Sequence, residues 1–504
     1  MTKPSIQPSP AQRLPELAPP PPAPLAQRRV LVVSDRLPIR LTREEGEGWR
    51  ADRAHGALVA ALNPVLRERR GVWIGWPGVT EEIAPDPQIL AGAIQAGGSS
   101  MRPVSLSARD VRGAYDGFGG GIIWPLFHEQ SLECRFDPAA WQAYRRVNRK
   151  FARAAAKAMS ATSRTGRESD LLWVHNHLLM NVAAELRTLR VPCRTAFFLH
   201  LPFPSADLFL KLPWRERLLR GLLAYDQLGF QTPRDLQNFL DCAHSLGAPV
   251  ERQDIRAGAF PIGVDFHSVA ERAALPEIGA AAARLRELHG GRSLVLGIDR
   301  LDRSKGIPEK LQAFAELLAR RPELHDRVSL IQVLLPSRED LPRHRELRCE
   351  IARQVGEING RFSRPGWIPV HFQQRTLAPD ELLAHYRAAD VALVTPLREG
   401  MNLIAKEYCA ARVDEQGTLV LSEFAGAAVQ LGQGALLVNP HNATSTARTL
   451  HKALRMAESD RGRRMRNLRE EVRRHDIFWW AESFLARALD EGPERTLRLE
   501  RTRQ

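Results

Sequence analysis

Short apolar runs alternate along the chain with longer stretches whose apolar residues recur at helical spacing. In the first half, runs of strand length stand at Arg29–Ser34, Leu171–Asn176, Thr195–His200 and Gln227–Gln231. Longer segments between them, such as Trp141–Met159, have the periodicity of amphipathic helices. Continuous apolar strands that alternate with helices are typical of a parallel sheet covered on both faces.

A second series of the same kind follows a pause at Phe260–Asp265. One of its helical stretches repeats Leu311, Phe314 and Leu318 on one face. Two such series predict an α/β protein with two doubly wound, Rossmann-like domains that face each other across a cleft, where a ligand can bind. The expected strands of the second series are Leu294–Ile298, Val328–Leu335, Ile368–Gln373, Val391–Pro396, Leu419–Ser422 and Ala435–Asn439.

The pause also predicts where the chain divides. We expect a first Rossmann-like domain over residues 29–265 and a second over residues 266–475. Residues 1–28 contain nine prolines and are expected to form a disordered tail. A helix is expected over Asp460–Asp490, and within residues 476–504 its end is expected to return to the first domain before a frayed terminus.

Composition narrows the class of function. The 504 residues exceed one ordinary core, and 44% hydrophobic with 26% charged residues is globular composition. No apolar run has the length of a membrane span, and no signal peptide is recognised. The five cysteines lack metal-site spacing, so we expect a cytoplasmic protein with no metal and no disulfide framework. The net charge of +14 comes without a basic–aromatic stripe, which argues against nucleic acid and leaves anionic small molecules as partners.

The sharpest local signal is the segment Gly297–Gly306, in which a buried strand ends and a helix follows. Arg300 and Lys305 follow at the carboxyl end of that strand. Cations placed there, beside a helix N-terminus, suit a diphosphate. On spacing alone, a solvated loop with internal salt bridges is the alternative.

A second signal is the loop Thr395–Leu403, where another strand leads through a glycine turn into a helix. The backbone amides of Met401, Asn402 and Leu403 are expected to face an anion or hydroxyl groups. Glu407 lies one turn further on and either joins this site or is an acid favoured by the helix dipole.

The first half offers aromatic and glycine-rich segments. Arg36 follows the opening strand, Gly56 marks a short turn, and Gly71–Gly78 and Tyr115–Trp124 combine aromatic rings with glycines. Sugar rings stack on such aromatic faces, although burial in the core is the commoner fate of these residues. His200 ends a strand and is either a partner for a sugar hydroxyl or a structural histidine.

Ten segments, in this order, make the chain similar to glycosyltransferase family 20 from about Arg29 to Ala486. They are Trp73–Gly78, Trp124–His128, Phe197–Pro204, Leu212–Arg215, Phe260–Gly263, Asp299–Asp302, Lys305–Gly306, Gly400–Leu403, Ala405–Tyr408 and Leu421–Ala428. The resemblance implies a GT-B fold whose second domain binds a sugar nucleotide and whose first domain binds the acceptor. It further implies transfer of glucose from UDP-glucose to glucose 6-phosphate with retention of configuration, giving trehalose 6-phosphate and UDP. No metal or other cofactor is implied, and a homo-oligomer, dimer or tetramer, is possible.

By motif position the resemblance also implies residue roles. His200, Arg300 and Lys305 would be catalytic. The donor would be bound by Gly56, Arg300, Lys305, Glu399, Met401, Asn402, Leu403 and Glu407. The acceptor would be bound by Arg36, Tyr115, Trp124, Asn176 and Arg338.

Four positions depart from the family pattern and leave alternatives open. The family has an aspartate where this chain has Asn176, in the acceptor site, and a glycine where it has Ala57, in the donor loop. It has a tyrosine where this chain has Arg303, and an aspartate where it has Glu399, beside the donor. A relative that glucosylates glycerol 3-phosphate is therefore one alternative, and a non-catalytic sugar-phosphate sensor is another.

Overall fold

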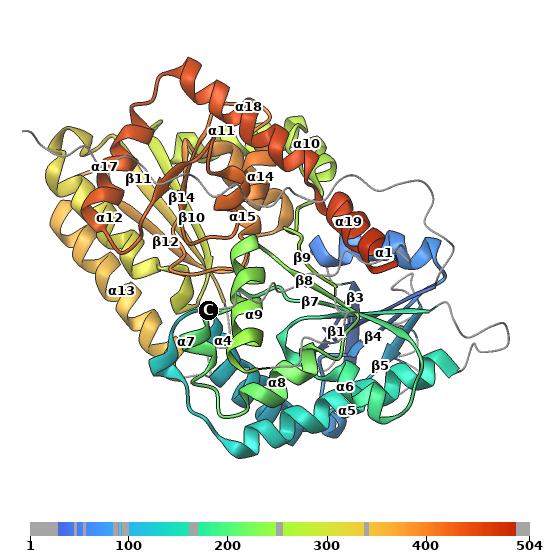
Figure 1. Cartoon of the computed structure of the whole chain (residues 1–504). Coiled ribbons are helices and arrows are strands. Elements are labelled where there is room, and N and C mark those ends of the chain that lie inside the picture. The colour runs from blue at the N-terminus through green and yellow to red at the C-terminus, as the bar shows by residue number, and fades with distance from the viewer. Residues whose placement is uncertain are drawn as a thin grey trace, which may run out of the picture.

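Two parallel sheets, each covered by helices, form the protein (Figure 1). The computed structural model describes residues 29–44, 48–53, 57–83, 89, 92, 100–160, 170–247, 256–336 and 342–489. The expected tail at residues 1–28 and the expected frayed end at 490–504 lie outside these ranges.

The first sheet has seven parallel strands in the order β5-β4-β1-β6-β7-β8-β9. The strand order reverses between β1 and β6, since the chain builds outward from β1 to β5 on one side and from β6 to β9 on the other. Its strands are β1 Val30–Arg36, β4 Val72–Trp76, β5 Ser100–Pro103, β6 Leu171–His175, β7 Arg194–Phe198, β8 Gln227–Phe230 and β9 Arg256–Ala259.

The second sheet has six parallel strands in the order β12-β11-β10-β13-β14-β15, and it reverses between β10 and β13. Its strands are β10 Ser293–Arg300, β11 Val328–Leu335, β12 Val370–Gln374, β13 Val391–Val394, β14 Thr418–Ser422 and β15 Leu436–Val438. A separate antiparallel pair is formed by β2 Ile39–Glu44 and β3 Gly48–Arg53.

The helices of the first half are α1 Ala57–Glu68, α3 Ala108–Asp110, the π-helix η2 Val111–Ile123, α4 Trp124–Phe127, α5 Pro138–Ser160, α6 Val182–Thr188, α7 Ala206–Phe209, α8 Arg215–Leu222 and α9 Pro233–Ser245. Those that follow are α10 Phe266–Ala273, α11 Pro276–Leu288, α12 Ile307–Arg320, α13 Pro342–Phe362, α14 Pro379–Ala388, α15 Leu403–Ala411, α16 Ala428–Leu431, α17 Ala443–Leu454, α18 Glu458–Arg474 and α19 Ile477–Leu489. Single 3₁₀ turns are η1 Glu81–Ile83, η3 Ser131–Glu133, η4 His177–Leu179, η5 Arg303–Lys305 and η6 Pro322–Leu324. None of the described helices combines the length and apolar character needed to cross a bilayer.

The α/β class and its two sheets were predicted correctly, but β4, β5 and β9 were not expected as strands. Strand β4 lies in the glycine- and tryptophan-rich segment that was considered a sugar platform, and its Trp73 is buried in the core. A side chain at Gly75 would come within 2.7 Å of the backbone of Arg36 and Leu37. The glycine therefore lets the end of β1 pass close to β4.

The segment Tyr115–Trp124 lies within helical structure, η2 and the start of α4, rather than in a glycine loop. A Cβ at Gly113 would lie 2.4 Å from the Cβ of Ala143 in α5. The absence of a side chain there allows η2 and α5 to pack closely, with Phe118 against Tyr144 at 4.3 Å between ring centroids. Close helix packing explains that glycine, and Tyr115 is buried as a consequence.

The single helix expected over Asp460–Asp490 is in fact two helices, α18 and α19. The chain breaks at Asp476 because its carboxylate accepts hydrogen bonds from the amides of Phe478 (3.0 Å) and Trp479 (2.8 Å) and so caps a new helix. A Cβ at Gly263 would lie 2.3 Å from the carbonyl carbon of Asp476. The two segments that connect the halves therefore lie against each other.

Helix α19 packs on the first sheet, beside α1 (Figure 1). Trp480 lies fully buried, with ring centroids 5.3 Å from Trp173 and 5.0 Å from Phe198. One apolar cluster thus runs from β1 and β6 through α19 to the second sheet. The residue boundaries of the two domains stay a prediction.

Candidate active site

The predicted site residues gather where the strand order of each sheet reverses. Arg300 ends β10 and Glu399 follows β13, the two strands that flank the reversal in the second sheet. Arg36 ends β1 and Asn176 follows β6, which flank the reversal in the first. Ligands of open α/β sheets bind at the carboxyl ends of the strands at such a point, because the connecting helices diverge there.

In the second half, the two loops after β10 and β13 are held together by backbone contacts. The amide of Leu397 donates to the carbonyl of Ser304 at 2.7 Å. Gly306 has φ of 62°, and a Cβ on it would lie 2.3 Å from the carbonyl oxygen of Thr395. Only glycine adopts this conformation readily and leaves room for the approach. The loops carrying the predicted cations and the predicted hydroxyl-binding acid are therefore one unit.

Glu399 connects the charged groups of this unit. One carboxylate oxygen forms an ion pair with the Lys305 ammonium, and the other accepts from Asn402 Nδ2 at 2.8 Å. Asn402 in turn caps α15, because its Oδ1 accepts from the amide of Ala405 at 2.8 Å. Met401 is buried beside it, and Leu403 is the first residue of α15.

Glu407 lies further along α15, where its carboxylate accepts a hydrogen bond from the Tyr386 hydroxyl at 2.8 Å. Burial raises the pKa of Glu407, against the smaller opposing effect of the Tyr386 hydrogen bond. A carboxyl group with a raised pKa holds its proton more readily, which suits it to hydrogen bonding with neutral hydroxyls.

Trp124 links the second-half cations to the first half. The Arg300 guanidinium lies 4.9 Å from the centroid of its ring, and His128 stacks on it at 4.3 Å between centroids. The Trp124 indole N–H has no hydrogen-bond partner among the described residues. The ring itself is half-buried and offers an apolar face of the kind on which a sugar ring can stack.

Charges beside this ring are set by their neighbours. Burial lowers the pKa of His128 to about 4, although the Asp302 carboxylate opposes the change. Burial alone would raise the pKa of Asp302, but Arg300, His128, Lys305 and a hydrogen bond from Ser304 outweigh it, so its pKa is lowered. The loop after β10 therefore carries an ionised acid and two cations, and the imidazole of His128 beside it is neutral at neutral pH.

The first half contributes a cation on an aromatic wall. The Arg36 guanidinium lies 4.8 Å from the centroid of Trp76, and Tyr115 packs edge-on against the same ring at 5.0 Å. The Tyr115 hydroxyl donates to the carbonyl of Asp35 at 2.7 Å, which fixes the chain at the end of β1. Arg36 is exposed at this position, so its guanidinium is accessible to an anion.

Asn176 adopts φ of 78° and ψ of 153°, a strained backbone conformation that residues with a side chain rarely adopt. Its Oδ1 accepts from the amide of His177 at 2.9 Å, and its Nδ2 donates to Asp35 Oδ1 at 3.4 Å. The side chain at the expected acceptor position is thus an amide that faces the carboxylate of Asp35.

His200 follows β7 and lies against a second histidine. Its Nε2 is 3.3 Å from Nδ1 of His175, and the two rings stack with centroids 5.5 Å apart. Burial lowers the pKa of His200 to about 4, and burial together with His200 lowers that of His175 well below its ordinary value. His200 is therefore neutral at physiological pH.

The two halves meet backbone to backbone at this histidine. A Cβ at Gly400 would lie 2.6 Å from the carbonyl oxygen of His200 and 2.8 Å from the nitrogen of Pro202. The loop after β13 therefore lies directly on the segment after β7. The segment that carries His200 and the loop that carries Glu399 are therefore neighbours.

Two predicted site residues, Gly56 and Arg338, fall outside the described residues. The others lie at the carboxyl ends of strands in the two sheets or in η2, α4 and α15. Their roles in binding are a prediction that the geometry does not test. No role was predicted for Asp35, His128, His175 or Arg398, although all four lie inside or beside segments that the sequence pattern singled out.

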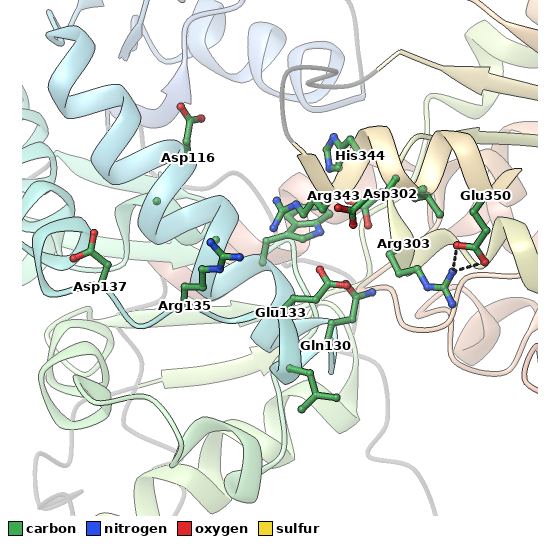
Figure 2. A pocket seen from close by; sticks show the side chains of 16 residues that line it. Asp116, Gln130, Glu133, Arg135, Asp137, Asp302, Arg303, Arg343, His344 and Glu350 are labelled. Carbon is green, nitrogen blue, oxygen red and sulfur yellow. Dashed lines mark hydrogen bonds and ion pairs between the residues drawn. The ribbon is translucent and has the colours of Figure 1, made fainter. Parts of the chain in front are cut away.

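A cavity of about 760 Å³ opens between η2 and η3 of the first half and α13 of the second. Figure 2 shows its charged lining, with Asp116 and Arg135 of the first half across from Arg343 of α13. Trp124 is the one described residue of the predicted site that lines it. Asp302 and Arg303 of the loop after β10 also line it, so the cavity borders that loop and the tryptophan ring.

Comparisons with known proteins agree with this geometry. The profile of glycosyltransferase family 20 matches residues 28–490. The chain is 42% identical over 474 residues to trehalose-6-phosphate synthase of Mycobacterium tuberculosis, covering 90% of this chain and 93% of that protein.

Solved structures give the same result. A trehalose-6-phosphate enzyme of E. coli bound to UDP-2-fluoro glucose has a TM-score of 0.81 and 32% identity, covering 92% of this chain and 100% of that one. The UDP-forming α,α-trehalose-phosphate synthase of Burkholderia xenovorans in complex with glucose 6-phosphate has a TM-score of 0.77 and 32% identity, with coverage of 92% and 100%. These similarities confirm the predicted GT-B arrangement, and the chain belongs to glycosyltransferase family 20.

Proposed function

We propose that this protein is a UDP-forming α,α-trehalose-phosphate synthase that transfers glucose from UDP-glucose to glucose 6-phosphate. The observation that carries the proposal is the pairing of two half-sites at the strand reversals of the two sheets. The half-site with Arg300 and Lys305 suits a diphosphate, and the half-site with Arg36 and the aromatic wall suits a sugar phosphate. The relatives named above act on or bind ligands of these two kinds.

In the reaction, the bond between glucose C1 and the β-phosphate oxygen of UDP breaks. A new bond forms between C1 and the anomeric hydroxyl oxygen of the acceptor. The hydroxyl proton passes to the departing phosphate oxygen, so that UDP and trehalose 6-phosphate result. Since the acceptor enters on the face from which UDP leaves, configuration is retained, and the protein need supply no nucleophile.

The residues then act by position and charge. Arg300 and Lys305 stabilise the negative charge that grows on the leaving diphosphate. The Glu399 carboxylate and the amides at the start of α15 bind donor hydroxyls. His200, neutral because burial lowers its pKa to about 4, hydrogen-bonds the transferred glucose without placing a cation beside the positively charged transition state.

We propose further that the reaction uses no metal or other cofactor. Among the described residues, no group of three or more histidine, cysteine or acidic side chains is arranged to hold a metal ion. A homo-oligomer, dimer or tetramer, stays a prediction.

The test is release of UDP from UDP-glucose with glucose 6-phosphate, with glycerol 3-phosphate and with neither acceptor. We expect release with glucose 6-phosphate alone. Release only with glycerol 3-phosphate would reassign the acceptor, which the neutral Asn176 makes the best alternative. Binding of UDP-glucose without release under any condition would indicate a sensor.

A further inference from the structure

A buried ion pair crosses between the two halves beside the predicted site. Arg398 follows β13, two residues before Gly400, and its side chain is 8% exposed. Its Nη2 lies 3.4 Å from Oδ1 of Asp235, in the first turn of α9, whose side chain is 2% exposed. The same guanidinium lies 3.3 Å from a carboxylate oxygen of Glu129, which is also in the first half.

The Asp235 carboxylate ties this arginine to the segment that carries His200. Its Oδ1 also accepts from the amide of Phe203 at 2.9 Å, three residues beyond His200. Its Oδ2 accepts from the Thr232 hydroxyl at 2.6 Å, and the same hydroxyl caps α9 by accepting from the amide of Asp235. The carboxylate is thus fixed to its own helix and to the His200 segment at once.

The neighbouring contact between the two halves, at Gly400, is a van der Waals contact and is therefore non-directional. Gly400 lies against the backbone from His200 to Pro202, since a Cβ on it would lie 2.6 Å from the His200 carbonyl oxygen and 2.8 Å from the Pro202 nitrogen. These contacts set how closely the segments can approach. They do not prevent sliding or opening, because a bare van der Waals contact is non-directional. The ion pair adds a directional link beside them.

The cost of this pair argues that it has a role beyond stability. Burial raises the pKa of Asp235, against the opposing charge of Arg398, and burial lowers the pKa of Arg398, against Asp235 and Glu129. Both changes show that each charge is disfavoured by removal from water. Buried pairs of this kind contribute little net stability compared with apolar side chains of the same size, and their best-attested use is to fix one geometry.

We propose that Arg398 and Asp235 are positioning residues that hold the His200 segment of the first half in register with the Glu399–Leu403 loop of the second. The pair sets the distance between donor and acceptor half-sites. It touches neither substrate, and for its kinetic readout the proposal rests on the glucosyl transfer proposed above. Without the pair, each half-site keeps its own residues, but the donor and the acceptor are no longer aligned for transfer.

The test uses Arg398→Met, Asp235→Asn and the double variant in the full chain. Asp235→Asn keeps an oxygen for the Phe203 amide and removes the charge. We expect each single variant to lower kcat at saturating substrates about 10-fold or more, the scale of a small misalignment of reacting groups. The affinity for UDP, which the second half binds, should stay within about twofold, and the double variant should lose about as much kcat as either single one because the residues act as a unit.

A matched control is Asp226→Asn. Asp226 also accepts hydrogen bonds in the first half, from the Thr195 amide (2.7 Å) and hydroxyl (2.9 Å), but it lies at the amino ends of the strands, away from the site. This variant should lower the melting temperature while kcat stays within about twofold, since distant changes act on stability alone. If Arg398→Met does not fold, Arg398→Lys and Asp235→Asn replace it.

Hydrogen exchange gives a readout that does not depend on the reaction. We expect faster exchange in residues 199–205 and 398–402 of Arg398→Met and not of Asp226→Asn. A kcat within about twofold of the wild type, together with unchanged exchange in both segments, would overturn the proposal. If the wild type transfers glucose to no acceptor, the proposed function fails, and the exchange measurement alone then decides whether the pair holds the halves together.

Discussion

The two proposed half-sites of this protein are built in opposite ways. The half-site of the second sheet comes from two loops, Arg300–Gly306 and Pro396–Asn402, that follow adjacent strands and bond directly to each other. The half-site of the first sheet draws Arg36, Tyr115 and His200 from β1, η2 and the end of β7. The compact half-site brings charged side chains such as Lys305 and Glu399 together. The dispersed half-site sets Arg36 and Tyr115 against the ring of Trp76. A diphosphate needs clustered cations, whereas a sugar phosphate needs a shaped surface.

The largest effect expected is in the compact half-site. Arg300→Ala or Lys305→Ala should lower kcat about 10²-fold or more, because each removes a cation from the leaving diphosphate. Initial rates of UDP release at saturating substrates measure it. The surface variant Arg463→Ala, which removes a cation of an exposed i,i+3 pair, is the control and should keep full activity. Near-normal turnover in both site variants would refute the assignment.

A tenfold effect is expected at Glu399, which joins Lys305 and Asn402 within the compact half-site. Glu399→Gln loses the ion pair with Lys305 but keeps an acceptor for Asn402. We expect kcat/KM for UDP-glucose to fall about 10-fold, the scale of one charged hydrogen bond. The KM for the acceptor should not change. If only the acceptor KM changed, Glu399 would act on the acceptor, and the assignment of its half-site to the donor would be contradicted.

A smaller effect is expected in the dispersed half-site. Asn176→Asp would place a second carboxylate beside Asp35, to which Asn176 now donates at 3.4 Å. Like charges at a partly exposed site cost about 1 kcal/mol, so the KM for the phosphorylated acceptor should rise about fivefold. The exchange Asp35→Asn with Asn176→Asp restores one carboxylate and should reverse the rise. A KM that falls in the single variant would show that an acid is wanted at position 176.

The smallest effect expected is on the pH dependence of turnover. His128 and His200, on either side of the site, have pKa values lowered to about 4 by burial. Both stay neutral above pH 6, so kcat at saturating substrates should vary less than about twofold between pH 6 and 8. Unfolding behaves differently, since the unfolded chain binds these protons below about pH 6.5; stability is full above that pH and is lost as pH falls toward 4. A kcat that follows one group with a pKa between 6 and 7 would contradict the neutral histidines.

The contrast between the half-sites also explains what the sequence could predict. The compact loops were recognised because strand, cation, glycine and helix follow one another within ten residues. Strand β4 and helix η2 were misread because the reasons for Gly75 and Gly113 lie in distant partners, the end of β1 and Ala143. The ion pair of Arg398 with Asp235 joins residues 163 positions apart, and no local pattern marks it. Asp476 breaks the C-terminal helix by capping, which the apolar periodicity did not reveal.

The central claim is that the second-sheet half-site binds the diphosphate and the first-sheet half-site binds the sugar phosphate. A crystal structure of the protein with UDP and glucose 6-phosphate tests it most directly. We predict that the diphosphate lies within hydrogen-bond distance of the Arg300 and Lys305 head groups, with the sugar phosphate on Arg36 across the cleft. A diphosphate remote from both second-half cations would contradict it.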